Sequence, residues 1–365
     1  MRTVRAAVLR GAGTAPEIRD FPSPELEPDA ALLEVELSEV CGTDVHLRDG
    51  LLPGVPYPII AGHVTVGRLG AIRGTLHDVS GRALVEGDRV TFLDVHRTCH
   101  ACWYCLVAKA STRCPERKVY GITYGVADGL TGGWAEAVYL KPGTLCLRLE
   151  DVPTTSFMAG GCALPTALHA VERARIRLGD TVLVLGSGPV GLSTIILARL
   201  AGARHVLCIG GPANRLAVAS RVGAAHTLDF QSCSVEAQRE WVLQRSDGRG
   251  ADVTLEASGD PAAVTHAMRC TRDAGCVVVV GQYTDRGTAS FNPHADLNRK
   301  HLDVRGCWGS DFSHFFRAVE LLQEPERRAL WERIPVQRYG LDGITAALDD
   351  VQNGRVVKAL VDPAR

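Results

Sequence analysis

The sequence predicts an α/β protein built from a β-rich domain followed by a doubly wound parallel sheet. The chain has 365 residues, more than a single hydrophobic core normally holds, so two domains are expected. Residues 1–163 are rich in Gly and Pro, with short apolar runs between turn signals. From residue 164 to 308, fully apolar strand patterns alternate with helix patterns, as in a parallel sheet covered by helices on both faces.

The strands of the first domain are expected where apolar and β-branched residues are enriched between turns, over 30–40, 88–95 and 135–141. In the second domain, strands are predicted over 181–186, 205–210, 226–230, 251–258 and 276–283. Helices are predicted between them over 190–203, 213–224, 234–246 and 260–272, the first of these amphipathic. A last segment, 309–365, is predicted to contain a helix over 311–323 and a closing strand over 355–361.

Charge and hydropathy restrict the classes of partner. The formal net charge is −1, which provides no general electrostatic attraction to nucleic acid or to an anionic membrane. The apolar run at the start of the chain is too short for a signal peptide, and no stretch approaches the roughly 18 apolar residues of a spanning helix. We therefore expect a cytoplasmic protein that acts on a small molecule.

The segment GSGPVG, residues 186–191, directly follows the strand pattern TVLVL and opens a helix pattern. In this context Gly186 permits a tight turn, Gly188 lets the backbone approach a pyrophosphate, and Gly191 lets helix and strand pack closely. This arrangement predicts a dinucleotide site. The alternative is a glycine turn in a sheet domain that binds no nucleotide.

The end of the next strand bears on which dinucleotide binds. A carboxylate usually stands about 20 residues after the glycines in NAD-binding chains, where it accepts hydrogen bonds from the ribose. Here the strand ends at Gly210, and Arg215 follows without a carboxylate at that point. Arg215 is able to pair with a 2′-phosphate, which favours NADP slightly over NAD. The alternative for Arg215 is a solvated arginine at a helix start.

The chain has 12 cysteines, and four of them crowd one segment, about 97–116. Disulfides do not persist in a reducing compartment, so clustered cysteines indicate metal binding. Cys99, Cys102 and Cys105 stand at two-residue intervals, and Cys114 closes the set. Four thiolates complete a tetrahedron around zinc with no open position, as in a structural site. A redox role and inert buried thiols are the alternatives.

Several motifs in order resemble the zinc-containing medium-chain dehydrogenase family of alcohol and polyol dehydrogenases, in particular its threonine and sorbitol dehydrogenase branch. The matching segments are CGTDVH at 41–46, GH at 62–63, the cysteine quartet, GGWAEAVYL at 132–140, CALPTALHA at 162–170, GSGPVG and NGRVVKALV near the end. The resemblance implies a GroES-like catalytic domain at 1–163, a Rossmann domain at 164–308 and a return to the first domain at 309–365. Family members are homodimers or homotetramers.

The resemblance also implies which residues act. It makes Cys41, His63 and Cys162 the ligands of a catalytic zinc, which brings the expected zinc count to two per subunit. It places Thr166, Pro189 and Val190 at the cofactor, together with the glycines. Zinc acidifies an alcohol as it acidifies water, and Thr43 then takes the proton and passes it to His46. Asp44 orients the zinc-binding His63.

The sequence departs from the family at two ligand-related positions. The family usually has Glu directly after the zinc-binding histidine, whereas here the residue is Val64. Polyol dehydrogenases commonly have Glu at the third ligand position, where this chain has Cys162. The surrounding residues still favour a secondary or polyhydroxylated alcohol, such as a cyclitol or a sugar-like intermediate. The spacing between Cys105 and Cys114 is also one residue longer than usual, which a surface lobe accommodates easily.

The alternatives are a simple primary-alcohol dehydrogenase, a zinc-free reductase of the same family, and a catalytically silent or regulatory NAD(P)-binding member. Zinc-free reductases generally lack both cysteine and histidine sets, and the intact CGTDVH motif argues against a silent protein. A zinc-ribbon nucleic-acid binder is disfavoured because no basic excess surrounds the quartet.

Overall fold

The computed structural model describes residues 3–365 and divides the chain into two compact units. Unit 1 comprises Met1–Cys162, Asp311–Pro325 and Pro335–Arg365, and unit 2 comprises Ala163–Ser310 and Glu326–Ile334. Met1 and Arg2, with which the predicted first domain begins, lie outside the described residues. The segment Glu326–Ile334, within the predicted C-terminal return, belongs to unit 2.

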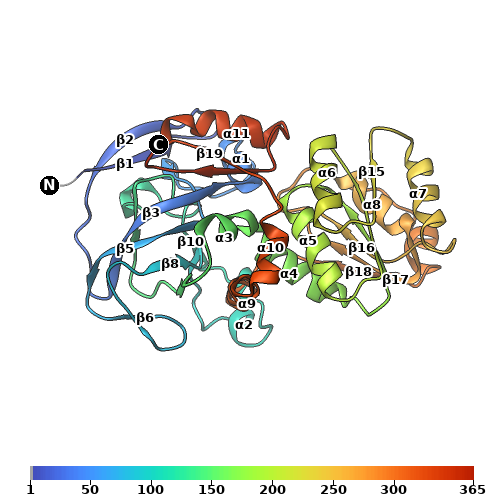
Figure 1. Ribbon diagram of the computed structural model, residues 1–365, viewed down its shortest axis with the longest axis horizontal. Coiled ribbons are helices and arrows are strands. Elements are labelled where there is room, and N and C mark those ends of the chain that lie inside the picture. The colour runs from blue at the N-terminus through green and yellow to red at the C-terminus, as the bar shows by residue number, and fades with distance from the viewer. Residues whose placement is uncertain (1–2) are drawn as a thin grey trace. The chain divides into compact units, whose positions relative to one another are not determined.

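Unit 1 is dominated by strands (Figure 1). Its strands are β1 (Thr3–Leu9), β2 (Glu17–Pro22), β3 (Ala30–Val40), β4 (Ile59–Ile60), β5 (Thr65–Arg73), β6 (Leu76–His77), β7 (Ala83–Leu84), β8 (Arg89–Phe92), β9 (Val95–Arg97), β10 (Lys118–Val119), β11 (Ala137–Leu140), β12 (Cys146–Arg148), β19 (Val336–Tyr339) and β20 (Lys358–Val361). Its helices are α1 (Gly42–Arg48), α2 (Trp103–Leu106), α3 (Thr154–Gly160), η1 (Ser111–Arg113), η2 (Val126–Asp128), α9 (Phe312–Gln323), η4 (Leu341–Gly343) and α11 (Ile344–Gln352).

The main sheet of unit 1 has the strand order β12-β8-β5-β3-β20-β19, with β11 also paired to β3. β3 is therefore an interior strand, which agrees with its mostly buried residues. β20 comes from the C-terminal end of the chain and runs antiparallel to β3. A second sheet has the order β2-β1-β4, and a core that includes Val8, Val40 and Trp134 fills the space between these strands, α1 and α11. The C-terminal segment thus completes the sheet from which Cys41 emerges.

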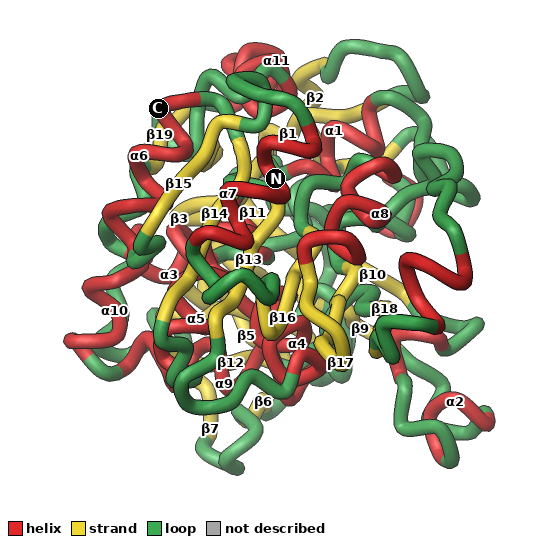
Figure 2. The backbone as a smooth tube through the Cα atoms, turned by 90° about the vertical axis from the view of Figure 1, so that its right-hand side faces the viewer, coloured by secondary structure: helices red, strands yellow, loops and turns green. Residues whose placement is uncertain are grey.

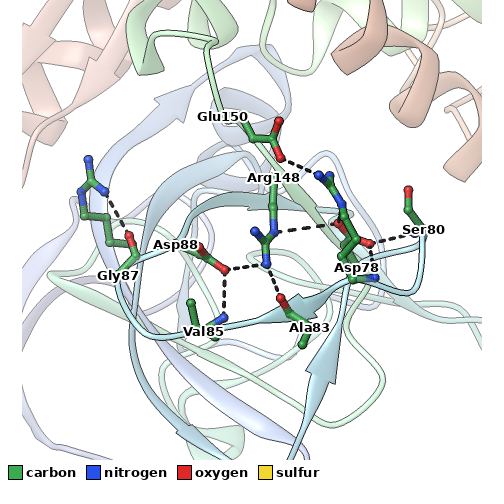
Figure 3. A network of polar contacts seen from close by, with 10 residues as sticks. Asp78, Ser80, Ala83, Val85, Gly87, Asp88, Arg148 and Glu150 are labelled. Carbon is green, nitrogen blue, oxygen red and sulfur yellow. Dashed lines mark hydrogen bonds and ion pairs between the residues drawn. The ribbon is translucent and has the colours of Figure 1, made fainter.

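A polar network ties the hairpin of β6 and β7 to β12 (Figure 3). Asp78 accepts hydrogen bonds from the backbone N–H and the Nε of Arg82, at 3.0 and 3.1 Å. Arg148 pairs with Asp88 at 3.0 Å, and Arg82 pairs with Glu150 at 2.7 Å. The Asp78 side chain is only 3% exposed, so these bonds satisfy a carboxylate that water cannot reach.

Unit 2 contains a six-stranded parallel sheet (Figure 2). Its strands are β13 (Thr181–Leu185), β14 (His205–Gly210), β15 (His226–Asp229), β16 (Ala251–Glu256), β17 (Thr271–Val279) and β18 (Asp303–Gly306). Its helices are α4 (Ala163–Ala174), α5 (Pro189–Leu200), α6 (Ala213–Val222), α7 (Val235–Gln244), α8 (Pro261–Cys270), η3 (Pro293–Asn298) and, but for its first residue, α10 (Pro325–Trp331).

The strand order in unit 2 is β15-β14-β13-β16-β17-β18, and every neighbouring pair is parallel. This is the doubly wound dinucleotide-binding order, with its reversal between β13 and β16. The predicted fold class is confirmed in this unit. In such sheets ligands bind beyond the carboxyl ends of the strands at the reversal, where the GSGPVG segment lies.

Two sequence expectations in unit 2 are wrong. The helix predicted to be amphipathic, α5, is buried at every position from Gly191 to Ala198, because α4, α6, β13 and β14 all pack against it. The helix predicted over 260–272 ends at Cys270, and β17 begins at Thr271, five residues before the predicted strand. The Thr271 hydroxyl lies at this junction, 2.7 Å from Thr254 Oγ1 on β16 and 2.8 Å from the Ala267 carbonyl of α8.

Within residues 3–365, no helix combines the length and the apolar character that crossing a membrane requires.

Candidate functional site

Three candidate metal ligands converge in unit 1. Cys41 leaves the end of β3, His63 precedes β5, and Cys162 follows α3. Their ligand atoms all lie within 4.8 Å of one another, and Sγ of Cys41 lies 3.7 Å from Nε2 of His63. Zinc bonds of about 2.0–2.3 Å at tetrahedral angles place donors about 3.5–3.8 Å apart, so this set fits the metal. Three donors leave the fourth position of a tetrahedron for another ligand.

The electrostatics of this set suit a cation. Burial would raise the pKa of Cys41, but hydrogen bonding from Cys162 and the nearby His63 lower it to about 7. The same hydrogen bond to Cys41, together with burial, raises the pKa of Cys162 well above its usual value. The hydrogen bond between the two sulfurs therefore favours the thiolate of Cys41 and the thiol of Cys162. A divalent cation favours the thiolate form of both.

The helix α1 starts at the first ligand and positions the residues around it. Cys41 has an extended backbone at the N-cap, and its N–H donates to Oδ2 of Asp44 at 2.8 Å. Oδ1 of Asp44 faces Nδ1 of His63 at 3.8 Å. Thr43 and His46 are half-buried and stand three residues apart, so they share a face of α1. The CGTDVH motif thus contains a candidate ligand, Cys41, and the carboxylate of Asp44 that bonds its backbone N–H. It also contains two side chains that can carry a proton, Thr43 and His46.

The sulfur atoms of the quartet also meet. All four lie within 4.8 Å of one another, and those of Cys102 and Cys105 are 3.6 Å apart. Backbone N–H groups, of Ala101 and Cys102 in particular, lower the pKa of Cys99 to about 7. The donor set fits tetrahedral zinc and has no position left for a substrate.

Unit 2 contains a cavity of about 880 Å³ at the carboxyl ends of β13, β14 and β16. Of the predicted cofactor residues, Gly186, Gly188, Gly210 and Arg215 line it. The others, Thr166, Pro189, Val190 and Gly191, lie outside this lining. A Cβ on Gly191 would stand 2.0 Å from the carbonyl oxygen of Gly186, so only glycine permits this close packing of helix and turn.

Several lining residues were not predicted from the sequence. Ser187 Oγ accepts a hydrogen bond from the N–H of Gly211 at 2.9 Å and donates one to the carbonyl of Gly211 at 3.0 Å. These bonds hold the turn after β13 against the turn after β14. Its position inside the GSGPVG motif was the available signal. His266 and Arg269 also line the cavity from α8, a segment of the sequence without a motif.

Sequence reasoning also missed two buried charged residues beside Cys162. Glu39 accepts a hydrogen bond from the N–H of Cys162 at 2.9 Å and forms an ion pair with Lys358. Lys358 opens the otherwise apolar strand KALV of β20, and that was the available signal. Glu39 gave none, because β3 also contains Glu34 and Glu36.

Comparisons with known proteins agree with this geometry. A family model described as zinc-binding dehydrogenase matches residues 189–324, and one described as alcohol dehydrogenase GroES-like domain matches residues 27–151. The 5-exo-hydroxycamphor dehydrogenase of Pseudomonas putida is 30% identical over 99% of each chain. An alcohol dehydrogenase structure from Thermotoga maritima has a TM-score of 0.93 and 31% identity, covering 99% of this chain and 100% of its own.

A putative zinc-binding dehydrogenase from Sinorhizobium meliloti, whose structure contains NADP, has a TM-score of 0.83 and 28% identity over 100% of both chains. The match to the GroES-like model covers most of the first β-rich segment and bears out the predicted fold class there.

Proposed function

This chain belongs to the zinc-dependent medium-chain dehydrogenase family, and on that premise we propose that it transfers a hydride between NAD(P) and a secondary or polyhydroxylated alcohol. The observation that carries the proposal is the convergence of Cys41, His63 and Cys162, whose donor atoms lie within 4.8 Å of one another. These residues would hold the catalytic zinc. The quartet at 99–114 would hold a second, structural zinc.

The chemistry divides between the metal and the chain's own residues. When bound, zinc acts as a Lewis acid that makes a substrate hydroxyl easier to deprotonate. Thr43 Oγ1 accepts that proton and donates its own toward His46, which lies on the same face of α1 and transfers it to solvent. Asp44 keeps His63 oriented by facing its Nδ1. Cys41 is held in place because its N–H is bonded to Asp44.

We propose NADP as the preferred cofactor. Arg215 lines the cavity at the end of β14, and burial lowers the pKa of its guanidinium. A bound phosphate would offset this cost of desolvation, because an anion nearby favours the charged form of arginine. Gly210 and Gly211 stand where an NAD-specific chain usually has a carboxylate. The Sinorhizobium meliloti relative with bound NADP supports this choice.

The substrate class rests on chemistry and likeness together. The Pseudomonas putida relative is named for a hydroxylated camphor, and the segment around Cys162 resembles the polyol and threonine dehydrogenase branch. We infer an alcohol with its hydroxyl on a substituted carbon. We also propose a homodimer or homotetramer, as in the family.

The test is a panel of hydroxylated metabolites followed by nicotinamide absorbance, combined with zinc analysis of the same preparation. The proposal predicts two zinc ions per chain and cofactor reduction with at least one secondary or polyhydroxylated alcohol. Two zinc ions with bound cofactor but no turnover on any alcohol would instead support a silent or regulatory protein.

A further inference from the structure

Glu39 is a buried carboxylate that connects the ligand candidate Cys162 to a buried lysine. Its Oε2 accepts the hydrogen bond from the backbone N–H of Cys162 at 2.9 Å, and its Oε1 lies 3.6 Å from Sγ of the same residue. Nζ of Lys358 contacts Oε1, and both charged side chains are 1% exposed. Burying two charges often costs more than their attraction returns, so this pair calls for a role other than stabilising the fold.

The register of the sheet places this pair on the side of the metal ligands. Val40 pairs with Ala359, and both contribute to the apolar core on one face of the sheet. Side chains alternate between faces along a strand, so Glu39 and Lys358 point to the opposite face. The extended backbone continues through Cys41, which therefore shares that face with Glu39.

Val64, which follows the candidate ligand His63, stands directly across from Glu39. Ser38 pairs with Thr65, and the N–H of Glu39 donates to the carbonyl of Val64 at 3.0 Å. Residues opposite each other on antiparallel strands share a face of the sheet. The position where the family usually has a carboxylate lies just before β5 and is thus a backbone neighbour of Glu39 in β3.

We propose that Glu39 is a positioning residue of the catalytic metal site, which supplies from β3 the carboxylate that the residue after His63 does not provide. This inference rests on the proposed zinc site. Glu39 fixes the backbone of Cys162 and adds negative charge next to the cation. Lys358 pairs with that carboxylate and holds it in place.

The charges explain why position 64 is apolar here. Two thiolates from Cys41 and Cys162 neutralise a divalent ion, and Lys358 neutralises Glu39. A second carboxylate at position 64 would lie opposite Glu39 in a buried site without a cation of its own, and like charges in that arrangement repel.

The residue before Cys162 is adapted to this arrangement. Gly161 has a φ of +49°, and a Cβ built there would stand 2.0 Å from Oε2 of Glu39 and 2.5 Å from Nζ of Lys358. Only glycine lets the carboxylate reach the N–H of Cys162. Gly161→Ala should therefore displace Glu39 and weaken metal binding in the same direction as its removal.

The experiment measures zinc affinity by competition with a chromogenic chelator, and the zinc of the quartet serves as an internal reference. We expect Glu39→Gln to weaken the catalytic zinc about 10–100-fold, the usual effect of removing a partner behind a ligand, and to leave the quartet zinc unchanged. The matched control is Asp78→Asn, another buried carboxylate of unit 1, which should leave both zinc affinities unchanged.

Two further variants separate positioning from general stability. Glu39→Gln with Lys358→Met leaves no unpaired buried charge, so the thermal unfolding midpoint should recover while zinc affinity stays low. Recovery of both properties would mean a structural role and would overturn the inference. The double variant Glu39→Ala with Val64→Glu restores a carboxylate near the site, at position 64, and should bind zinc more tightly than Glu39→Ala alone. Equal zinc affinities would contradict the proposal that Glu39 provides the carboxylate that position 64 lacks.

Failure of this inference differs from failure of the proposed function. A wild-type protein that binds zinc only at the quartet would refute the catalytic site itself. A wild-type protein with two zinc ions, and a Glu39→Gln variant with the same two affinities, would refute only the role of Glu39.

Discussion

Oδ1 of Asp44 lies 3.8 Å from Nδ1 of His63, and both side chains are buried. The other carboxylate oxygen of Asp44 accepts the N–H of Cys41 at 2.8 Å. One carboxylate therefore connects two candidate ligands that stand 22 positions apart in the sequence. It accepts a hydrogen bond from the backbone of one ligand and faces the ring of the other.

Asp44→Asn should weaken catalytic zinc binding about 10–100-fold, because an amide is a poorer acceptor for the imidazole N–H that faces it. Zinc retained during titration with a chelator measures this. Asp49→Asn, at the opposite end of α1, is the matched control and should behave as wild type. Equal zinc retention in Asp44→Asn and wild type would contradict the role of Asp44.

Thr43→Val should lower kcat about 10²–10⁴-fold with a smaller effect on KM, because it removes the hydroxyl that takes up the substrate proton. Thr43→Ser keeps the hydroxyl and should recover most of the activity. Steady-state kinetics with the best alcohol from the panel provide the comparison. A Val variant as active as the Ser variant would rule out a proton relay through this residue.

His46→Gln should slow alcohol oxidation and flatten its rise with pH, because the relay loses its titrating end. Zinc content should stay at the wild-type value, since His46 is outside the ligand set. The pH dependence of kcat tests this. An unchanged profile would place the proton exit elsewhere.

Arg215→Leu should reduce kcat/KM for NADP about 10–100-fold and change that for NAD little, because a charge-assisted contact with a 2′-phosphate contributes about 1.5–3 kcal/mol. The ratio of the two efficiencies is the quantity to measure. A wild type with the higher kcat/KM for NAD, or a variant whose kcat/KM falls equally for both cofactors, would show that Arg215 does not bind the 2′-phosphate.

Asp78 should make stability depend on acid pH. Burial would raise the pKa of its carboxyl, but hydrogen bonds from the N–H groups of Arg82 and Ser80 and the Arg82 charge hold it below the usual value. The folded pKa is below the unfolded one of about 3.9, so the stabilisation is complete above that value and is lost as pH falls through the folded pKa.

Asp78→Asn should therefore lower the thermal unfolding midpoint at pH 7, because hydrogen bonds to a buried charged group contribute about 1.5–3 kcal/mol. The difference from wild type should shrink below about pH 4, as the wild-type carboxyl takes up its proton. A difference that is constant from pH 7 to pH 3 would show that the charge is not responsible.

The regular elements were largely predictable because each carries a local pattern. β3 has the predicted bounds of Ala30–Val40, and β13 coincides with the apolar run TVLVL that precedes GSGPVG. The boundary between α8 and β17 was missed because Thr271 pairs with Ala251 of β16, a contact between distant segments that local propensity does not specify. The burial of α5 on all sides depends on packing, which apolar letters alone do not specify.

Some residues of the candidate site could likewise be proposed from the sequence, and others could not. Cys41 and His63 could be proposed from the sequence because the segments that contain them resemble a known family, and their metal-binding role stays a prediction. The pair of Glu39 and Lys358 could not be found, because its members are separated by 319 positions and meet only through the pairing of β3 with β20. The fold is needed to identify the partner of each charged residue.

The most direct test of the account is anomalous diffraction at the zinc absorption edge from crystals of the wild-type protein. The account predicts a zinc peak about 2.0–2.3 Å from Sγ of Cys41, Nε2 of His63 and Sγ of Cys162, in addition to one inside the quartet. A peak inside the quartet with none among these three residues would contradict it.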